Sequence, residues 1–196
     1  IFVSDSMNHR IQEYSLEGRF VGQWGIEGSE SDEIRYPWGL SKGKDDQILV
    51  ADWGNDRIER YSIEGEYISS FYGEDSDTPI NRPAGVAVSS DGNMYVADWG
   101  NQLLQVFDAD GKFLARNRGE ADLNPWSVEY LASQDDERNA RESYVPVYQP
   151  DTGDPSEISA RMEPYLWDPV SVELDEEGRV YVLETGRHRF QIFERI

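Results

Sequence analysis

The sequence contains no cysteine and only two histidines, His9 and His188. The lack of cysteine excludes disulfides, thiolate metal ligands and a cysteine nucleophile, and it leaves the redox compartment open. Lysine is scarce as well, with Lys42, Lys44 and Lys112 against fifteen arginines. No apolar run is long enough to cross a bilayer, so a membrane is not an expected partner.

Positive charge is outnumbered, because 39 Asp and Glu residues against 18 Lys and Arg residues give a formal net charge of −21 at pH 7. A surface this acidic repels phosphate backbones, so nucleic acid is not an expected partner either. Two interpretations of the acidity stay open. High acid with low lysine resembles a salt-adapted surface, and an ordinary acidic soluble protein would show the same excess.

One short segment recurs four times in the chain. Residues 50–58 and 96–104 share the run Val-Ala-Asp-Trp-Gly-Asn, and looser copies occupy residues 3–11 and 183–190. Successive copies of the acidic residue lie 47, 46 and 86 residues apart, and 86 is two steps of 43. A fixed period of roughly 40–50 residues is typical of blades or solenoid units that stack on a shared core.

The third copy shows the content of one unit. Residues 83–88 form a short apolar segment, Asp91-Gly92 supplies a hairpin turn, and residues 94–98 are apolar again. Residues 104–107 alternate as a half-buried strand does, and residues 112–115 follow another turn. Four antiparallel strands in each unit predict an all-β protein built from propeller blades.

These motifs also carry a family resemblance. Pro-x-Gly-Val-Ala-Val, Asp-Gly-Asn-x-Tyr-Val-Ala-Asp-x-Gly-Asn and Val-Phe-Asp-x-Asp-Gly follow one another in the third unit and resemble the NHL repeat. The resemblance covers most of residues 1–120 and 168–196. NHL repeats build β-propellers that usually have six blades, so the resemblance implies an NHL-type β-propeller. One branch of the family binds RNA through a basic face, a property that the net charge of −21 argues against here.

The units divide residues 1–196 as a single propeller domain. We expect a blade without its first strand in 1–35, blades in 36–81 and 82–118, and a blade without its last strand in 169–196. About four recognisable blades predict a partial propeller, as an open arc or as part of a longer six-bladed parent. A closed ring of four blades is the less favoured alternative, because closure would need complete blades at both ends.

Residues 119–168 interrupt the repeat, and we expect a largely helical insertion there. Asn124-Pro125 and Asp154-Pro155 each place a cap residue before proline at the first helical position. Glu157, three residues after Asp154, completes a capping box. Residues 144–149 are expected to be extended. The alternative is a decayed blade, because Pro125-Trp126 resembles the start of an inner strand at residues 37–40.

Four tryptophans are the candidate binding residues: Trp38, Trp53, Trp99 and Trp126. In a propeller, the turn between the second and third strands lies on the same face as the connection into the next inner strand. That arrangement would place the tryptophans and the 119–168 segment together, as a binding site for a protein or a small ligand. The alternative is that these rings pack between blades.

The repeated Asp-x-x-Asn turns are assigned a structural role, because Asp and Asn bond to nearby backbone amides and hold turns. Their residues are Asp5, Asn8, Asp52, Asn55, Asp98, Asn101 and Glu184, with Arg10, Arg57 and Arg189 placed to pair with the carboxylates. A calcium site is the alternative, because calcium accepts such oxygens as ligands. No metal ligand and no cofactor is predicted.

The favoured function is a non-catalytic binding or scaffold module, since no catalytic residue can be assigned. The sequence has no Ser-His-Asp arrangement and no phosphate loop. The alternative is a metal-dependent lactonase-like or lyase-like propeller enzyme, which rests on fold analogy. Amidating lyases of this fold hold zinc with several histidines, a set that this chain lacks. A purely structural module of a larger protein is a third hypothesis.

Overall fold

The computed structural model describes residues 1–121, 125–143 and 153–194. Its main part is a series of four antiparallel sheets, each made of strands that are consecutive in the chain. The first sheet holds β1 (Phe2–Asp5), β2 (Arg10–Tyr14) and β3 (Phe20–Trp24), and the second holds β6 (Pro37–Lys42), β7 (Ile48–Asp52), β8 (Arg57–Tyr61) and β9 (Tyr67–Phe71). The third holds β10 (Pro83–Val88), β11 (Met94–Asp98), β12 (Leu103–Phe107) and β13 (Phe113–Asn117), and the fourth holds β14 (Pro169–Leu174), β15 (Val180–Glu184) and β16 (Arg189–Phe193).

Shorter elements connect these sheets. The 3-10 turns η1 (Ser6–Asn8) and η2 (Trp53–Asn55) follow β1 and β7, and β4 (Ile26–Glu27) pairs in parallel with β5 (Glu33–Ile34). Three helices, α1 (Pro125–Ala132), α2 (Asp135–Ser143) and α3 (Pro155–Arg161), lie between the third and fourth sheets in the chain. None of the helices described has the length and apolar character that a transmembrane helix needs.

Apolar side chains fill the space between each pair of neighbouring sheets. Ile11 and Ile34 pack against Val50 and Tyr61, where the first sheet meets the second. Two further clusters join the second sheet to the third and the third to the fourth. Strands β7 and β11 are buried along their whole length, because another sheet covers each face. This explains why their sequences are continuously apolar up to the closing aspartate.

The first strands of the last three sheets, β6, β10 and β14, lie side by side. The chains approach closely there: a Cβ atom added to Gly39 would lie 2.7 Å from the Cα atom of Gly85. Glycine is therefore needed at Gly39. The second strand of one sheet also contacts the first strand of the next, as β7 does with β10 and β11 with β14.

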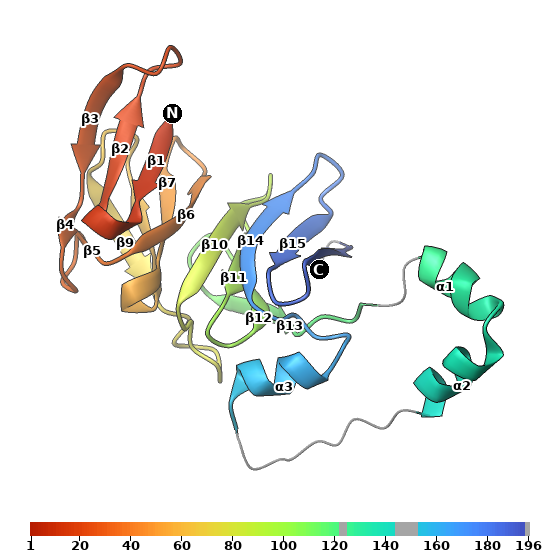
Figure 1. The fold of residues 1–196 in the computed structure, drawn as a ribbon. Helices are drawn as coiled ribbons and strands as arrows, with labels where there is room; N and C mark the ends of the chain where they lie inside the picture. Colours follow the sequence, from red (N-terminus) through yellow and green to blue (C-terminus); the bar gives the residue numbers. More distant parts are fainter. Residues whose placement is uncertain (122–124, 144–152, 195–196) are drawn as a thin grey trace.

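Figure 1 shows the four sheets following one another as an arc, with the N-terminus in the first sheet and the C-terminal strands in the last. Within the described residues, no hydrogen-bonded strand pair joins the first and last sheets. The arrangement places every turn between a second and a third strand at the same end of its sheet.

The segment between β13 and β14 contains the three helices and no strand in its described part. Helix α1 begins at Pro125 as expected, and Asp154 caps α3 by accepting a hydrogen bond from the Ser156 amide at 2.9 Å. Asn124 and the expected extended segment 144–149 lie outside the described residues. Helices α1 and α2 pack on each other, and Figure 1 shows them standing away from the four sheets.

Candidate binding site

Each turn after a second strand is held by its acidic residue. Oδ1 of Asp52 accepts the Arg35 amide at 2.7 Å, and Oδ2 accepts Nδ2 of Asn55 at 2.7 Å and Nε of Arg57 at 3.0 Å. Asp98 makes the matching bonds to the Asn81 amide (3.1 Å) and to Nδ2 of Asn101 (2.8 Å). The carboxylate thus ties the turn to the chain that enters the first strand of its own sheet.

The first and last copies keep the same plan. Asp5 accepts Nδ2 of Asn8 at 2.9 Å and Nε of Arg10 at 2.8 Å. Glu184 accepts the Trp167 amide at 2.8 Å and Nε of Arg189 at 2.5 Å. The carboxylates of all four turns thus accept N–H donors, and no group of three or more His, Cys, Asp or Glu in the described residues is arranged to hold a metal ion.

The residue that ends each turn has a left-handed backbone, with φ of 54° at His9, 56° at Asp56 and 59° at Gln102. Its side chain accepts the backbone amide that precedes the next sheet. His9 Nδ1 accepts the Tyr36 amide at 3.1 Å, Asp56 Oδ1 accepts that of Arg82 at 2.7 Å, and Gln102 Oε1 accepts that of Asp168 at 2.6 Å. These three bonds link successive sheets, and His9 serves as one of these links.

Tyr36 and Arg82, which two of these bonds hold, belong to a cluster of side chains around Trp53. Trp38 and Trp53 have ring centroids 5.9 Å apart at an interplanar angle of 65°, and Tyr36 meets Trp53 at 6.2 Å and 88°. The ring centroid of Trp99, in the turn of the third sheet, lies 6.0 Å from that of Trp53. The Arg82 guanidinium lies over Trp53 at 5.2 Å and over Trp99 at 6.0 Å. The cluster therefore spans the turns of the second and third sheets.

A pocket of about 280 Å³ opens in this cluster, lined by Ser6, Tyr36, Trp38 and Trp53. Trp38 is 44% exposed, so packing between the sheets does not bury it. The Ser6 hydroxyl donates to the Pro37 carbonyl oxygen at 2.5 Å, which leaves three aromatic rings as the dominant surface. An apolar concave site of this kind suits the apolar part of a small ligand or of a partner's side chain.

Three of the four predicted tryptophans thus lie together, and Trp126 lies elsewhere. Trp126 is 83% exposed on α1, and the ring contacts described in the cluster come from the sheets. Sequence reasoning did not single out Tyr36 or Arg82. A signal was available, because both immediately precede the proline that begins a first strand.

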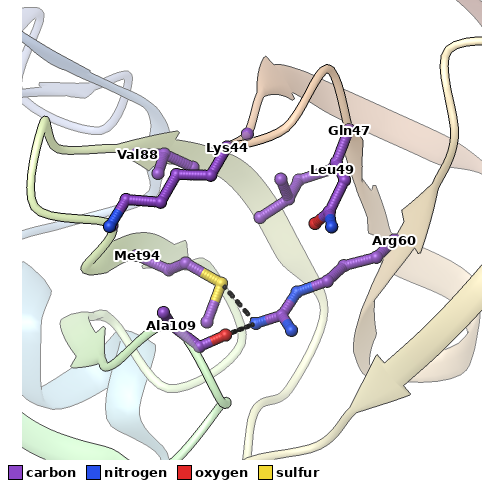
Figure 2. Close-up of a pocket in the computed structure, with 9 residues that line it drawn as sticks. Lys44, Gln47, Leu49, Arg60, Val88, Met94 and Ala109 are labelled. Atoms are coloured by element: carbon purple, nitrogen blue, oxygen red, sulfur yellow. Dashed lines mark hydrogen bonds between the residues drawn. The ribbon is translucent and has the colours of Figure 1, made fainter.

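A second crevice lies at the opposite ends of the second and third sheets (Figure 2). Arg60 donates to the Ala109 carbonyl oxygen at 2.5 Å and contacts Met94 Sδ at 3.2 Å, and Lys44 donates to the Asp91 carbonyl oxygen at 2.5 Å. Burial lowers the pKa of Arg60. The crevice encloses about 30 Å³, the space of a single water. It joins two sheets and does not suit a ligand.

Buried charge is concentrated beneath the turn of the second sheet. Arg57 is 2% exposed and contacts Asp52 at 3.0 Å and Glu59 at 2.8 Å, and the Tyr61 hydroxyl donates to Glu59. Burial raises the pKa of Glu59 to about 7. In the third sheet, burial raises the pKa of Asp98 to about 6, against the hydrogen bonds that Asp98 accepts. These carboxyl groups have no solvent access, so they cannot act on a ligand in the pocket.

Comparison with known proteins identifies first the fold and then the repeat. The structure resembles streptogramin B lyase (14% identity, TM-score 0.54, covering 99% of this chain and 50% of that one). It also resembles virginiamycin B lyase from Staphylococcus aureus (12% identity, TM-score 0.53, 98% and 51%) and Kuenenia stuttgartiensis hydrazine synthase (13%, 0.53, 98% and 45%). The chain spans about half the length of these proteins, and its fold is that of a β-propeller, as predicted.

The NHL repeat model matches residues 81–107, which run from the residue before Arg82 to the end of β12. The chain therefore carries an NHL repeat, and the resemblance drawn from the motifs of the third unit is confirmed. No curated protein matches the chain by sequence. The number of blades in a complete ring and the expected division into blades stay predictions.

Proposed function

We propose that the chain is a non-catalytic binding module, for a protein or small-molecule ligand, and that the ligand docks in the pocket of Tyr36, Trp38 and Trp53. The observation that supports this role is the exposed pocket itself, which places three aromatic rings at the end of the sheets where loops converge. Nucleic acid and membrane surfaces are not among the partners proposed, because the net charge is −21.

The test uses benzyl alcohol, a neutral ring compound that fits an apolar pocket, with saturation-transfer NMR as the measurement. Trp38→Ala should weaken binding at least about tenfold, because it removes one of three aromatic walls. Trp126→Ala is the matched control, since it removes an exposed tryptophan outside the cluster. Equal binding to the Trp38 variant and the wild type, with both folded by circular dichroism, would show that the pocket is not the site.

A lyase-like enzyme is the second candidate, favoured by the structural likeness to proteins named as lyases. One neighbour is a catalytically inactive H270A virginiamycin B lyase described with Quinupristin. The direct test is to incubate this chain with quinupristin, with and without added divalent cations, and to follow its conversion by liquid chromatography. Conversion above a protein-free control would replace the binding proposal with an enzymatic one.

A further inference from the structure

The walls of the aromatic pocket stand at steep angles to one another. Trp38 and Tyr36 meet the central Trp53 ring at 65° and 88°. Rings at such angles form separate walls of the pocket that they line, whereas stacked rings would present a single flat platform. The negative faces of several rings around one point attract a cation, and cages of this kind recognise quaternary ammonium groups.

The chain already places one cation against this cluster. The Arg82 guanidinium lies 5.2 Å from the Trp53 ring centroid and 6.0 Å from that of Trp99. Within the described part of the chain, no lysine or arginine lies over Tyr36 or Trp38 in the same way. The cluster thus pairs with a cation over Trp53 and Trp99, whereas Tyr36 and Trp38 have none over their rings in the described part of the chain.

The charge of the whole protein acts in the same direction. A net charge of −21 creates a negative potential that concentrates cations near the surface and repels anions. A carboxylate also lies behind one wall, because Glu27 is 3.7 Å from His9 Nε2 and His9 packs against Tyr36 with ring centroids 4.5 Å apart. An anionic ligand is therefore disfavoured, which leaves cationic and neutral ligands to be distinguished.

The lining of the pocket further limits the kind of cation. A primary ammonium group needs acceptors to replace its lost water, and burying it without them is costly. The surface that the four lining residues present to the pocket is almost wholly apolar, so it offers such a group few acceptors. A quaternary ammonium has no N–H groups to satisfy, so apolar rings can surround it without leaving a donor unpaired.

We propose that the pocket of Tyr36, Trp38 and Trp53 binds a small ligand that carries a quaternary ammonium group, which rests on the binding role proposed above and adds the ligand's chemistry. The volume of about 280 Å³ accommodates a trimethylammonium group together with part of the chain attached to it. The rings supply the attraction, and the acidic surface raises the local concentration of the ligand.

The experiment compares choline with 3,3-dimethyl-1-butanol, which has the same shape and a carbon atom in place of the charged nitrogen. Both are titrated into the full chain at one ionic strength, set with sodium chloride, and binding is measured by saturation-transfer NMR. Choline should bind about tenfold more tightly than the alcohol, within the range expected for a partly desolvated cation–π contact. Raising the salt concentration should weaken the binding of choline and leave that of the alcohol unchanged.

A variant separates the charge preference from simple packing. Trp38→Leu keeps an apolar wall and removes a π-face, so the preference for choline should fall toward equality with the alcohol. Trp126→Leu is the matched control and should keep the preference. Retention of the full preference in Trp38→Leu would overturn the proposal.

The remaining outcomes are also decisive. If the alcohol binds as tightly as choline, the pocket is merely apolar, and the ligand class is wrong while the binding role stands. If neither compound binds, the proposed ligand class is wrong, and the benzyl alcohol titration decides separately whether the pocket binds anything.

Discussion

The second and third sheets share a backbone plan and differ in the charge that they bury. In β8 the chain places Arg57 and Glu59 beneath the turn, where β12 places Leu103 and Gln105. All four side chains are buried. At these two positions the same architecture thus carries an ion-pairing couple in the second sheet and neutral side chains in the third.

The two solutions supply hydrogen-bond donors to the same place. In the third sheet, Gln105 Nε2 donates to Asp98 Oδ2 at 2.5 Å and to the Thr78 carbonyl oxygen at 3.0 Å. In the second sheet, Arg57 donates to Asp52 and to three carbonyl oxygens of the connection before β6, those of Ser29, Glu30 and Glu33. The comparison indicates that the fold needs donors under the turn, and that charge is one of two ways to provide them.

The largest expected effect comes from removing the cation. Arg57→Leu would leave the carboxylates of Asp52 and Glu59 buried without their partner, and breaking a buried ion pair in this way costs about 3–5 kcal/mol. Urea denaturation at pH 7 measures the loss in the free energy of unfolding. Leu103→Ala in the third sheet provides a volume-changing control that involves no charge.

The double variant Arg57→Leu, Glu59→Gln sharpens the comparison, because it gives β8 the residues of β12. It should recover at least about 1 kcal/mol relative to Arg57→Leu alone, since a neutral amide replaces the unpaired carboxylate. A double variant no more stable than the single one would show that the two sheets are not interchangeable at these positions.

The next effect is a dependence on pH that the third sheet lacks at the equivalent position. Burial raises the pKa of Glu59 from 4.5 to about 7, so the folded protein holds this proton more tightly than the unfolded chain does. The contribution of Glu59 to stability is therefore full below about pH 4.5, falls as the pH rises toward 7, and is level above that. The slope is at most about 1.4 kcal/mol for each pH unit.

Glu59→Gln removes this contribution, because an amide does not titrate. As the pH rises from 5 to 8, the free energy of unfolding of the variant should increase by about 2–3 kcal/mol relative to that of the wild type. Comparing the two proteins by urea denaturation cancels the titration of Asp98 and of the other shared groups. The reciprocal variant Gln105→Glu should acquire the same kind of pH dependence, and a constant difference across this range would contradict the raised pKa.

The sequence predicted the repeat, the strand order within each sheet and the position of the turns, since these depend on local alternation and on Asp-Gly and Asp-x-x-Asn signals. It did not predict the burial of Glu59. The alternation Arg57-Ile58-Glu59-Arg60 is typical of a strand with one face exposed to solvent, but sheets cover both faces of β8. Burial on the second face depends on the first sheet and the connection after it, which are distant in the chain and which no local pattern reports.

The aromatic pocket was predicted in part, for a similar reason. Trp53 and Trp99 occupy the same place in two copies, so the repeat predicts that they lie at one end of the sheets. Trp126 is grouped with them because it lies in the connection that leads into the next first strand, and the structure places it on α1. Tyr36 joins the pocket through its left-handed backbone, with φ of 53°, which composition does not reveal.

The smallest expected effect extends the comparison to the last sheet. Phe190 pairs with Leu183 across β15 and β16 as Leu104 pairs with Ala97 across β11 and β12. Leu104 is fully buried between sheets, whereas Phe190 is 60% exposed. Leu104→Ala should cost about 2–5 kcal/mol in the free energy of unfolding, because it leaves a cavity. Phe190→Ala should change the free energy by no more than about 0.5 kcal/mol, as surface substitutions usually do.

Urea denaturation of both variants at one protein concentration measures the two effects. Since the strands and their register are equivalent, a small loss for Phe190→Ala beside a large loss for Leu104→Ala would assign the stabilisation at this position to the neighbouring sheet rather than to the strand pair. A loss above about 2 kcal/mol for Phe190→Ala would contradict the exposed surface, because a cost of that size requires a buried ring. Phe190 would then be buried in solution, as Leu104 is, and the surface that buries it would come from outside the described part of this chain.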